Sequence, residues 1–165
     1  MVRLGASLRI VAAALVCFAA LTGCSGEPEP PPLAEATKKL VSDGDAATSW
    51  IEARVTGLTK ERADGPDRNS SCTPDKQRRF YIAKASFADP SKESPVSLVG
   101  LLKAQFFSRG YHNEVVDSLD LWEDDTSVAV LVNPEAGLTF ILFARLDSTP
   151  SIAIVGKTEC YPRAR

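Results

Sequence analysis

The chain has a single histidine, His112, and histidine is the side chain that acid–base catalysis uses most often. A hydrolase would pair it with an acidic or serine partner, for which Asp117 and Ser118 are the nearby candidates. His112 lies just past the predicted end of a helix, where exposed polar residues are common, and no Gly-x-Ser-x-Gly nucleophile motif accompanies it. We therefore expect no enzymatic activity, and keep hydrolysis through His112 as an alternative.

Acidic side chains cluster at one place in the chain, and carboxylates are ligands that calcium and magnesium prefer. The cluster consists of Asp117, Asp120, Glu123, Asp124 and Asp125. It lacks the alternate acids followed by glycine that an EF-hand loop requires, and a lone histidine excludes a multi-histidine site. We interpret it as an exposed strand edge and turn, and expect neither a bound metal nor a cofactor.

A basic cluster of Lys76, Arg78 and Arg79 is interpreted as the solvated start of a strand. Gly156-Lys157-Thr158 is similar to the end of a phosphate-binding loop. Such a loop needs a glycine five positions earlier, where this chain has Ser151, and a helix afterwards. The chain stops soon after Thr158, so we predict the end of a strand there.

The N-terminus combines positive charge with a short apolar segment. Arg3 and Arg9 precede an uncharged run of 12 residues, Ile10 to Leu21. A bilayer-spanning helix needs about 20 residues, so this run is too short to span and instead has the length of the apolar part of a secretory signal.

The residues that follow, Leu21-Thr22-Gly23-Cys24, resemble the lipobox of bacterial lipoproteins, in which an apolar and two small residues precede a cysteine. The resemblance implies that residues 1–23 are a signal peptide, that the Cys24 thiol receives a diacylglycerol, and that Cys24 becomes the N-terminus. It implies a protein held on the extracytoplasmic face of the cell membrane. The alternative is that Cys24 keeps its thiol and pairs in a disulfide.

Composition agrees with a small envelope protein and argues against nucleic acid as a partner. The 165 residues carry 19 basic and 21 acidic side chains, and removal of the signal peptide leaves 17 and 21. The mature chain is mildly acidic, so we do not expect electrostatic adhesion to anionic lipid, and the acyl chains must hold it at the membrane. The alanine- and valine-rich usage, single methionine and proline-rich segment are similar to those of small actinobacterial envelope lipoproteins.

Residues 24–33 are predicted to be a lipidated cysteine and a linker. Four prolines among residues 25–33 favour an extended polyproline II stalk of about 25 Å. Residues 34–162 are predicted to form one domain.

Helical spacing predicts one or two helices within residues 33–58, with Ser42-Asp43-Gly44-Asp45 as a break or kink. Trp50 lies beside the second apolar stripe, and we expect it in the core. Residues 59–75 are predicted to be a loop because they are rich in turn formers. A clearer helix begins with Ser94 as N-cap and Pro95 at its first position, and ends near Gly110. Its apolar face consists of Leu98, Val99, Leu102 and Phe106.

Residues 79–87 alternate in a way that predicts a strand, with Phe80 and Ile82 facing one way and Tyr81 and Lys84 the other. Four more strands are predicted at 113–122, 127–132, 138–146 and 151–157, with Trp122 as an exposed contact residue. Short connections imply antiparallel neighbours. The expected fold is α+β: an antiparallel sheet of about five strands with helices packed on one face.

The lipoprotein resemblance also carries a disulfide prediction. Cys17 leaves with the signal peptide and Cys24 is lipidated, which leaves Cys72 and Cys160 in an oxidising compartment. An even number of exported thiols usually pairs, so we predict a Cys72–Cys160 bond, with two free thiols as the alternative.

These observations favour a lipid-anchored binding or interaction module without catalytic activity, whose partner is an envelope protein or a cell-wall component. Two alternatives remain open. One is the hydrolase using His112. The other is a carrier that holds an apolar ligand in a cavity between the sheet and the helices.

Overall fold

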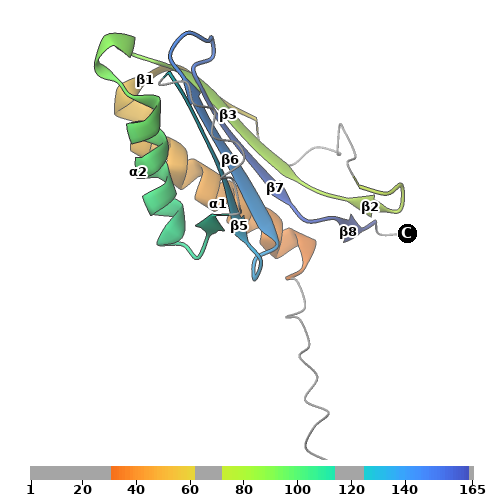
Figure 1. Ribbon diagram of the computed structural model, residues 1–165. Coiled ribbons are helices and arrows are strands. Elements are labelled where there is room, and N and C mark those ends of the chain that lie inside the picture. Colours follow the sequence, from red (N-terminus) through yellow and green to blue (C-terminus); the bar gives the residue numbers. More distant parts are fainter. Residues whose placement is uncertain (1–30, 62–71, 114–124, 164–165) are drawn as a thin grey trace, which may run out of the picture.

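A computed structural model describes residues 31–61, 72–113 and 125–163. These residues form an antiparallel sheet with two α-helices packed on one face, so the predicted α+β class is confirmed (Figure 1). The predicted signal peptide, Cys24, most of the predicted linker and nearly all of the strand predicted at 113–122 lie outside the described residues.

The elements in chain order are α1 (Leu33–Ile51), a 3₁₀ turn (Glu52–Arg54), β1 (Val55–Glu61), β2 (Lys76–Gln77), β3 (Phe80–Phe87), a second 3₁₀ turn (Pro90–Lys92), α2 (Pro95–Phe107), β4 (His112–Asn113), β5 (Thr126–Asn133), β6 (Leu138–Arg145), β7 (Ile152–Thr158) and β8 (Tyr161–Pro162). The main sheet has the order β1-β3-β7-β6-β5-β4, and β2 pairs with β8 in a separate small sheet. Strands β5, β6 and β7 form the predicted meander, in which each strand pairs with the next.

Helix α1 runs without interruption through Ser42-Asp43-Gly44-Asp45, so the predicted break is absent. The reason is tertiary packing. Gly44 is buried against the ring of Tyr81, and a Cβ at Gly44 would lie 2.5 Å from Tyr81 Cε1. Glycine is therefore present because the sheet approaches closely, and not because the helix ends. Trp50, expected in the core, is 58% exposed because it lies on the outward side of the same helix.

The last four residues of the segment predicted to be helical, 55–58, instead belong to the edge strand β1, which continues to Glu61 into the predicted loop. Ile51, Val55 and Leu58 have helical spacing, but α1 ends at Ile51 and the chain turns into the sheet. A bulge interrupts the pairing with β3 between Thr56 and Thr59, and Gly57 has a φ of 63° there. Valine, two threonines and a glycine fit a bulged edge strand better than a helix, and this signal was available in the sequence.

Helix α2 matches its prediction closely. Ser94 Oγ accepts a hydrogen bond from the backbone N–H of Ser97 at 3.3 Å, and Pro95 occupies the first turn. At the other end, Gly110 has a φ of 86°, and the N–H of Tyr111 donates to the carbonyl of Phe106 at 3.1 Å. This is a Schellman motif, completed by an edge-to-face contact of the Phe106 and Tyr111 rings at 5.0 Å. The predicted apolar face, Leu98, Val99, Leu102 and Phe106, is buried.

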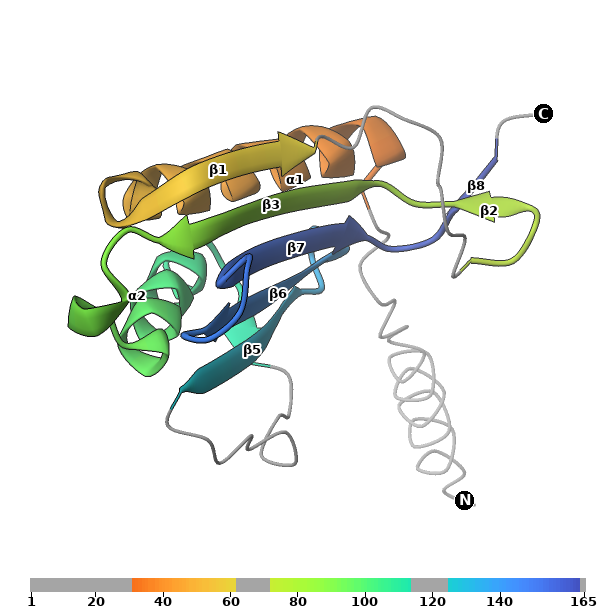
Figure 2. The ribbon, with the colours of Figure 1, turned by 90° about the horizontal axis from the view of Figure 1, so that it is seen from above.

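The core lies between the helices and one side of the sheet (Figure 2). Helix α1 packs on β3 and β7, and α2 packs on β5 and β6. On β3 the buried side carries Tyr81, Ala83, Ala85 and Phe87. The predicted strand is confirmed, but its faces differ from the prediction: Lys84 shares the side of Phe80 and Ile82, and Tyr81 is fully buried beneath α1.

The two glycines inside helices should respond oppositely to alanine. We expect Gly44→Ala to lower the free energy of unfolding by about 1–3 kcal/mol, because the new methyl group meets the buried Tyr81 ring. Gly100 in α2 has open space around it, so Gly100→Ala should raise the free energy of unfolding by about 0.5–1 kcal/mol. Urea unfolding of both variants measures the difference, and equal effects would contradict the close approach of α1 to β3.

Candidate functional site

The described structure does not bring together most of the residues that the sequence suggested for lipidation, metal binding or catalysis. Cys24 and the acidic residues Asp117, Asp120, Glu123 and Asp124 lie outside the described residues. Asp125 is described, and it accepts a hydrogen bond from the Thr126 hydroxyl at 2.9 Å and faces the Arg145 guanidinium at 3.8 Å. Its pKa is lowered, chiefly by the Thr126 hydrogen bond. In the part of the chain that is described, no group of three or more His, Cys, Asp or Glu side chains is arranged to hold a metal ion.

His112 begins the short edge strand β4 and its side chain is exposed. It pairs across the sheet with Val132. Within residues 31–61, 72–113 and 125–163 no hydrogen bond or ion pair reaches its ring, and its proposed partners Asp117 and Ser118 lie outside these ranges. The described geometry therefore gives His112 no catalytic partner.

A buried carboxylate that the sequence analysis missed joins the two helices. Asp43 is 3% exposed and accepts three hydrogen bonds: from Lys39 Nζ at 2.9 Å, Arg109 Nη1 at 3.0 Å and the Tyr111 hydroxyl at 2.8 Å. Burial, followed by the negative charge of Asp43, raises the pKa of Tyr111, which therefore stays a neutral donor. Asp43 is fully satisfied, and its role is to connect α1 with the C-terminal end of α2.

The space between the sheet and the helices is filled by side chains. The rings of Phe106, Tyr111 and Phe140 pack together there with centroid separations of 4.6–5.6 Å. Near the start of α1 lies an open recess of about 480 Å³, and four of its lining residues carry charged side chains: Glu35, Lys39, Arg109 and Glu135. The described residues thus show a packed core at the place where the carrier alternative requires an apolar cavity.

The face of the sheet that points away from the helices is unusually apolar. Cross-strand pairing places twelve residues of β3, β7, β6 and β5 on it in three rows, and nine of the twelve are apolar. From β3 to β5 the rows are Phe80, Lys157, Thr139 and Val132; Ile82, Val155, Ile141 and Val130; Lys84, Ala153, Phe143 and Val128. All except Lys84 are half-buried. We call this surface the open face.

Antiparallel strands with one solvated side normally alternate apolar and polar residues, whereas strands covered on both sides are apolar throughout. Strands β5, β6 and β7 are largely apolar on both sides, although both helices cover only the side opposite the open face (Figure 1). The middle row, from Ile82 to Val130, contains only aliphatic side chains. Such a surface can bind another apolar surface.

A small projection, which we call the arm, continues from one end of the sheet. It consists of residues 72–79 and 157–163, including β2 and β8. Cys72 and Cys160 are joined by a disulfide with a Cα–Cα distance of 5.8 Å, so the predicted pairing is present in the structure. Arg79 and Thr158 exchange two hydrogen bonds of 3.0 Å at the base of the arm. The sequence predicts this bond because assigning Cys17 to a signal peptide and Cys24 to a lipid leaves two cysteines, which an oxidising compartment would pair.

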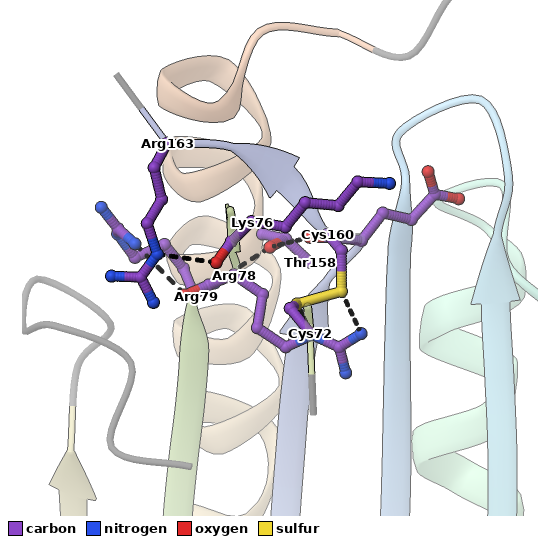
Figure 3. The surroundings of a disulfide bond; sticks show 8 residues. Cys72, Lys76, Arg78, Arg79, Thr158, Cys160 and Arg163 are labelled. Atoms are coloured by element: carbon purple, nitrogen blue, oxygen red, sulfur yellow. Dashed lines mark hydrogen bonds between the residues drawn. A yellow bond between two sulfur atoms is a disulfide. The ribbon is translucent and has the colours of Figure 1, made fainter. Parts of the chain in front are cut away.

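The arm has a high density of basic side chains around the disulfide. Arg78 donates to both sulfur atoms, from Nε to Cys72 Sγ at 3.2 Å and from Nη2 to Cys160 Sγ at 2.8 Å (Figure 3). Arg163 Nε donates to the Lys76 carbonyl at 2.8 Å. The predicted basic cluster therefore belongs to the arm, before β3 begins.

Comparisons of the chain with protein-family models, with curated proteins and with solved structures find no match. Among the described helices, none is long and apolar enough to cross a bilayer.

Replacing both cysteines should destabilise the domain. The bond closes 88 residues of sequence, for which chain entropy gives an upper bound of about 4.6 kcal/mol. We expect the double variant Cys72→Ser/Cys160→Ser to unfold at lower urea concentration than the parent, with a loss of up to that amount. Mass spectrometry of the non-reduced protein should find neither thiol alkylatable, and two alkylatable thiols would contradict the bond.

Proposed function

We propose that this chain is a lipoprotein of the cell envelope, anchored through Cys24 on the extracytoplasmic face of the membrane, and that its domain is a non-catalytic binding module. The open face is the surface we assign to binding, and its partner is an apolar segment of another envelope component. The anchor rests on the resemblance of Leu21-Thr22-Gly23-Cys24 to a lipobox.

The observation that supports a binding module is the apolar character of the open face. Nine apolar side chains in three aligned rows each keep part of their surface in contact with water, and this part is removed from water only when another surface covers it. Lysines at two of the remaining positions, Lys84 and Lys157, flank the aliphatic middle row and favour a partner with acidic groups beside its apolar part.

The two alternatives have less support. Hydrolysis needs a partner for His112, and the described residues supply none. A carrier would need a cavity, and the rings of Phe106, Tyr111 and Phe140 occupy the space between helices and sheet.

Lipidation at Cys24 is tested by phase partitioning of the protein with a non-ionic detergent. We expect the parent to enter the detergent phase and Cys24→Ser to stay in the aqueous phase, because the thiol that carries the lipid is lost. Cys17→Ser is the matched control and should partition like the parent, since Cys17 lies within the signal peptide. Detergent partitioning that persists in Cys24→Ser would refute the anchor.

Binding through the open face is tested by valine-to-threonine changes, which keep the β-branched shape and add one hydroxyl. A photoreactive residue is placed at Ile141, and the yield of its crosslink to the partner is measured in the producing cells. We expect the double variant Val130→Thr/Val155→Thr to lower this yield at least tenfold. Both valines belong to the same aliphatic row as Ile141.

The matched control is Val96→Thr, the same chemical change at a residue of α2 that is 60% exposed. It should leave the crosslink unchanged. A crosslink of equal yield from a photoreactive residue at Val96, or one insensitive to the open-face changes in folded protein, would contradict the assignment of the binding surface.

A further inference from the structure

The arm concentrates positive charge in a chain that is acidic as a whole. Its residues, 72–79 and 157–163, include two acidic side chains, Asp75 and Glu159. The five basic ones are Lys76, Arg78, Arg79, Lys157 and Arg163. Because the mature chain as a whole has a net negative charge, the residues outside the arm are more acidic than the chain taken together.

The basic groups of the arm have no ion-pair partner within the described ranges. Arg78 contacts the disulfide sulfurs, and Arg79 donates to Gln77 Oε1 at 3.2 Å. Arg163 donates to a backbone carbonyl of Lys76. These contacts orient the side chains. Asp75 interacts electrostatically with Lys76, but the arm has five basic side chains against two acidic ones, so it keeps an excess of positive charge that can bind anions.

The arm holds these charges in fixed relative positions. The Cys72–Cys160 bond and the β2–β8 pairing tie its two segments together, and the Arg79–Thr158 hydrogen bonds join it to the main sheet. Because the arm is fixed, its basic groups lose less conformational entropy when they bind than those of a free tail would.

The arm lies at the same end of the molecule as the beginning of α1, as both views show (Figures 1 and 2). Helix α1 begins at Leu33, nine residues after Cys24. The linker predicted from the sequence therefore leads from Cys24 to this end of the domain.

We propose that the arm binds the anionic head groups of the bilayer in which Cys24 is anchored. The domain then stands with its arm end on the membrane, and the open face points to the side, where a partner can reach it. This inference rests on the proposed anchor for its biological setting, but it makes a separate prediction about the unlipidated domain.

The overall negative charge of the mature chain does not prevent this contact. Electrostatic interactions are screened over about 8 Å at physiological ionic strength. The eight residues of β3 alone extend about 26 Å at the usual rise of a strand, so acidic groups toward its far end contribute little at the arm. The net charge of the whole chain predicts no electrostatic adhesion to anionic lipid, but this expectation does not extend to the end of the molecule that carries the arm. Glu61, at the end of β1, and Glu135, in the turn before β6, are acidic groups of the neighbouring elements.

The test uses the mature protein from residue 24 with Cys24→Ser, so that no acyl chain contributes. It is sedimented with vesicles of phosphatidylcholine, with or without about a third of phosphatidylglycerol. We expect binding to the anionic vesicles only, and its loss in 0.5 M salt, where the screening length is only a few ångströms.

A triple variant, Lys76→Gln, Arg79→Gln and Arg163→Gln, should bind on the order of 100-fold more weakly, since each basic group near an anionic surface contributes about fivefold. The matched control, Arg54→Gln, Lys92→Gln and Lys103→Gln, makes the same change in net charge at residues outside both the arm and the open face. It should bind within about threefold of the parent. Arg78 is left intact in both because it contacts the disulfide.

Equal weakening by both triple variants would overturn the proposal, as would equal binding to neutral and anionic vesicles. So would binding to soluble polyphosphate without binding to vesicles. Because the assay omits the acyl chains, its result is independent of whether Cys24 is lipidated. Failure of the anchor is detected by detergent partitioning, and failure of the arm by the vesicles.

Discussion

The distance between α1 and the sheet depends on two positions that have no side chain. Gly44 in α1 accommodates the ring of Tyr81, and Gly156 in β7 accommodates Leu40, whose Cδ1 would lie 2.7 Å from a Cβ at Gly156. This close approach brings Asp43 within reach of Arg109 and Tyr111, which follow α2. One short helix–sheet distance thus brings the buried carboxylate of α1 to the residues that follow α2 and closes the core around Phe106.

Much of the fold could be predicted because its signals are local. The Ser94-Pro95 start and the Gly110 end of α2 are set by capping chemistry within a few residues. The strands β5, β6 and β7 are separated by turn-forming residues, which made the meander predictable. Gly44 shows where local reasoning fails, since a glycine required by packing and a glycine that ends a helix are identical in sequence.

The candidate site was less accessible to sequence reasoning. The disulfide could be predicted from the compartment that the resemblance to a lipobox implies, whereas the open face depends on the register of the strands. Only the pairing of Ile82 with Val155 and of Ile141 with Val130 shows that these aliphatic residues form one row on the side away from the helices. The arm was similarly hidden, because Lys157 and Arg163 are far in sequence from Lys76 and join it through the β3–β7 and β2–β8 pairings and the disulfide.

The position of the disulfide also divides the chain mechanically. The covalent loop from Cys72 to Cys160 encloses β3, α2 and the strands of the meander, whereas α1 and the edge strand β1 precede it. A pulling force applied from the N-terminal side therefore acts first on α1 and β1. Once these have detached, the loop transmits the force through one sulfur–sulfur bond, and the enclosed residues add no length to the extended chain. For a domain held by its N-terminus, this limits how far it can be unravelled.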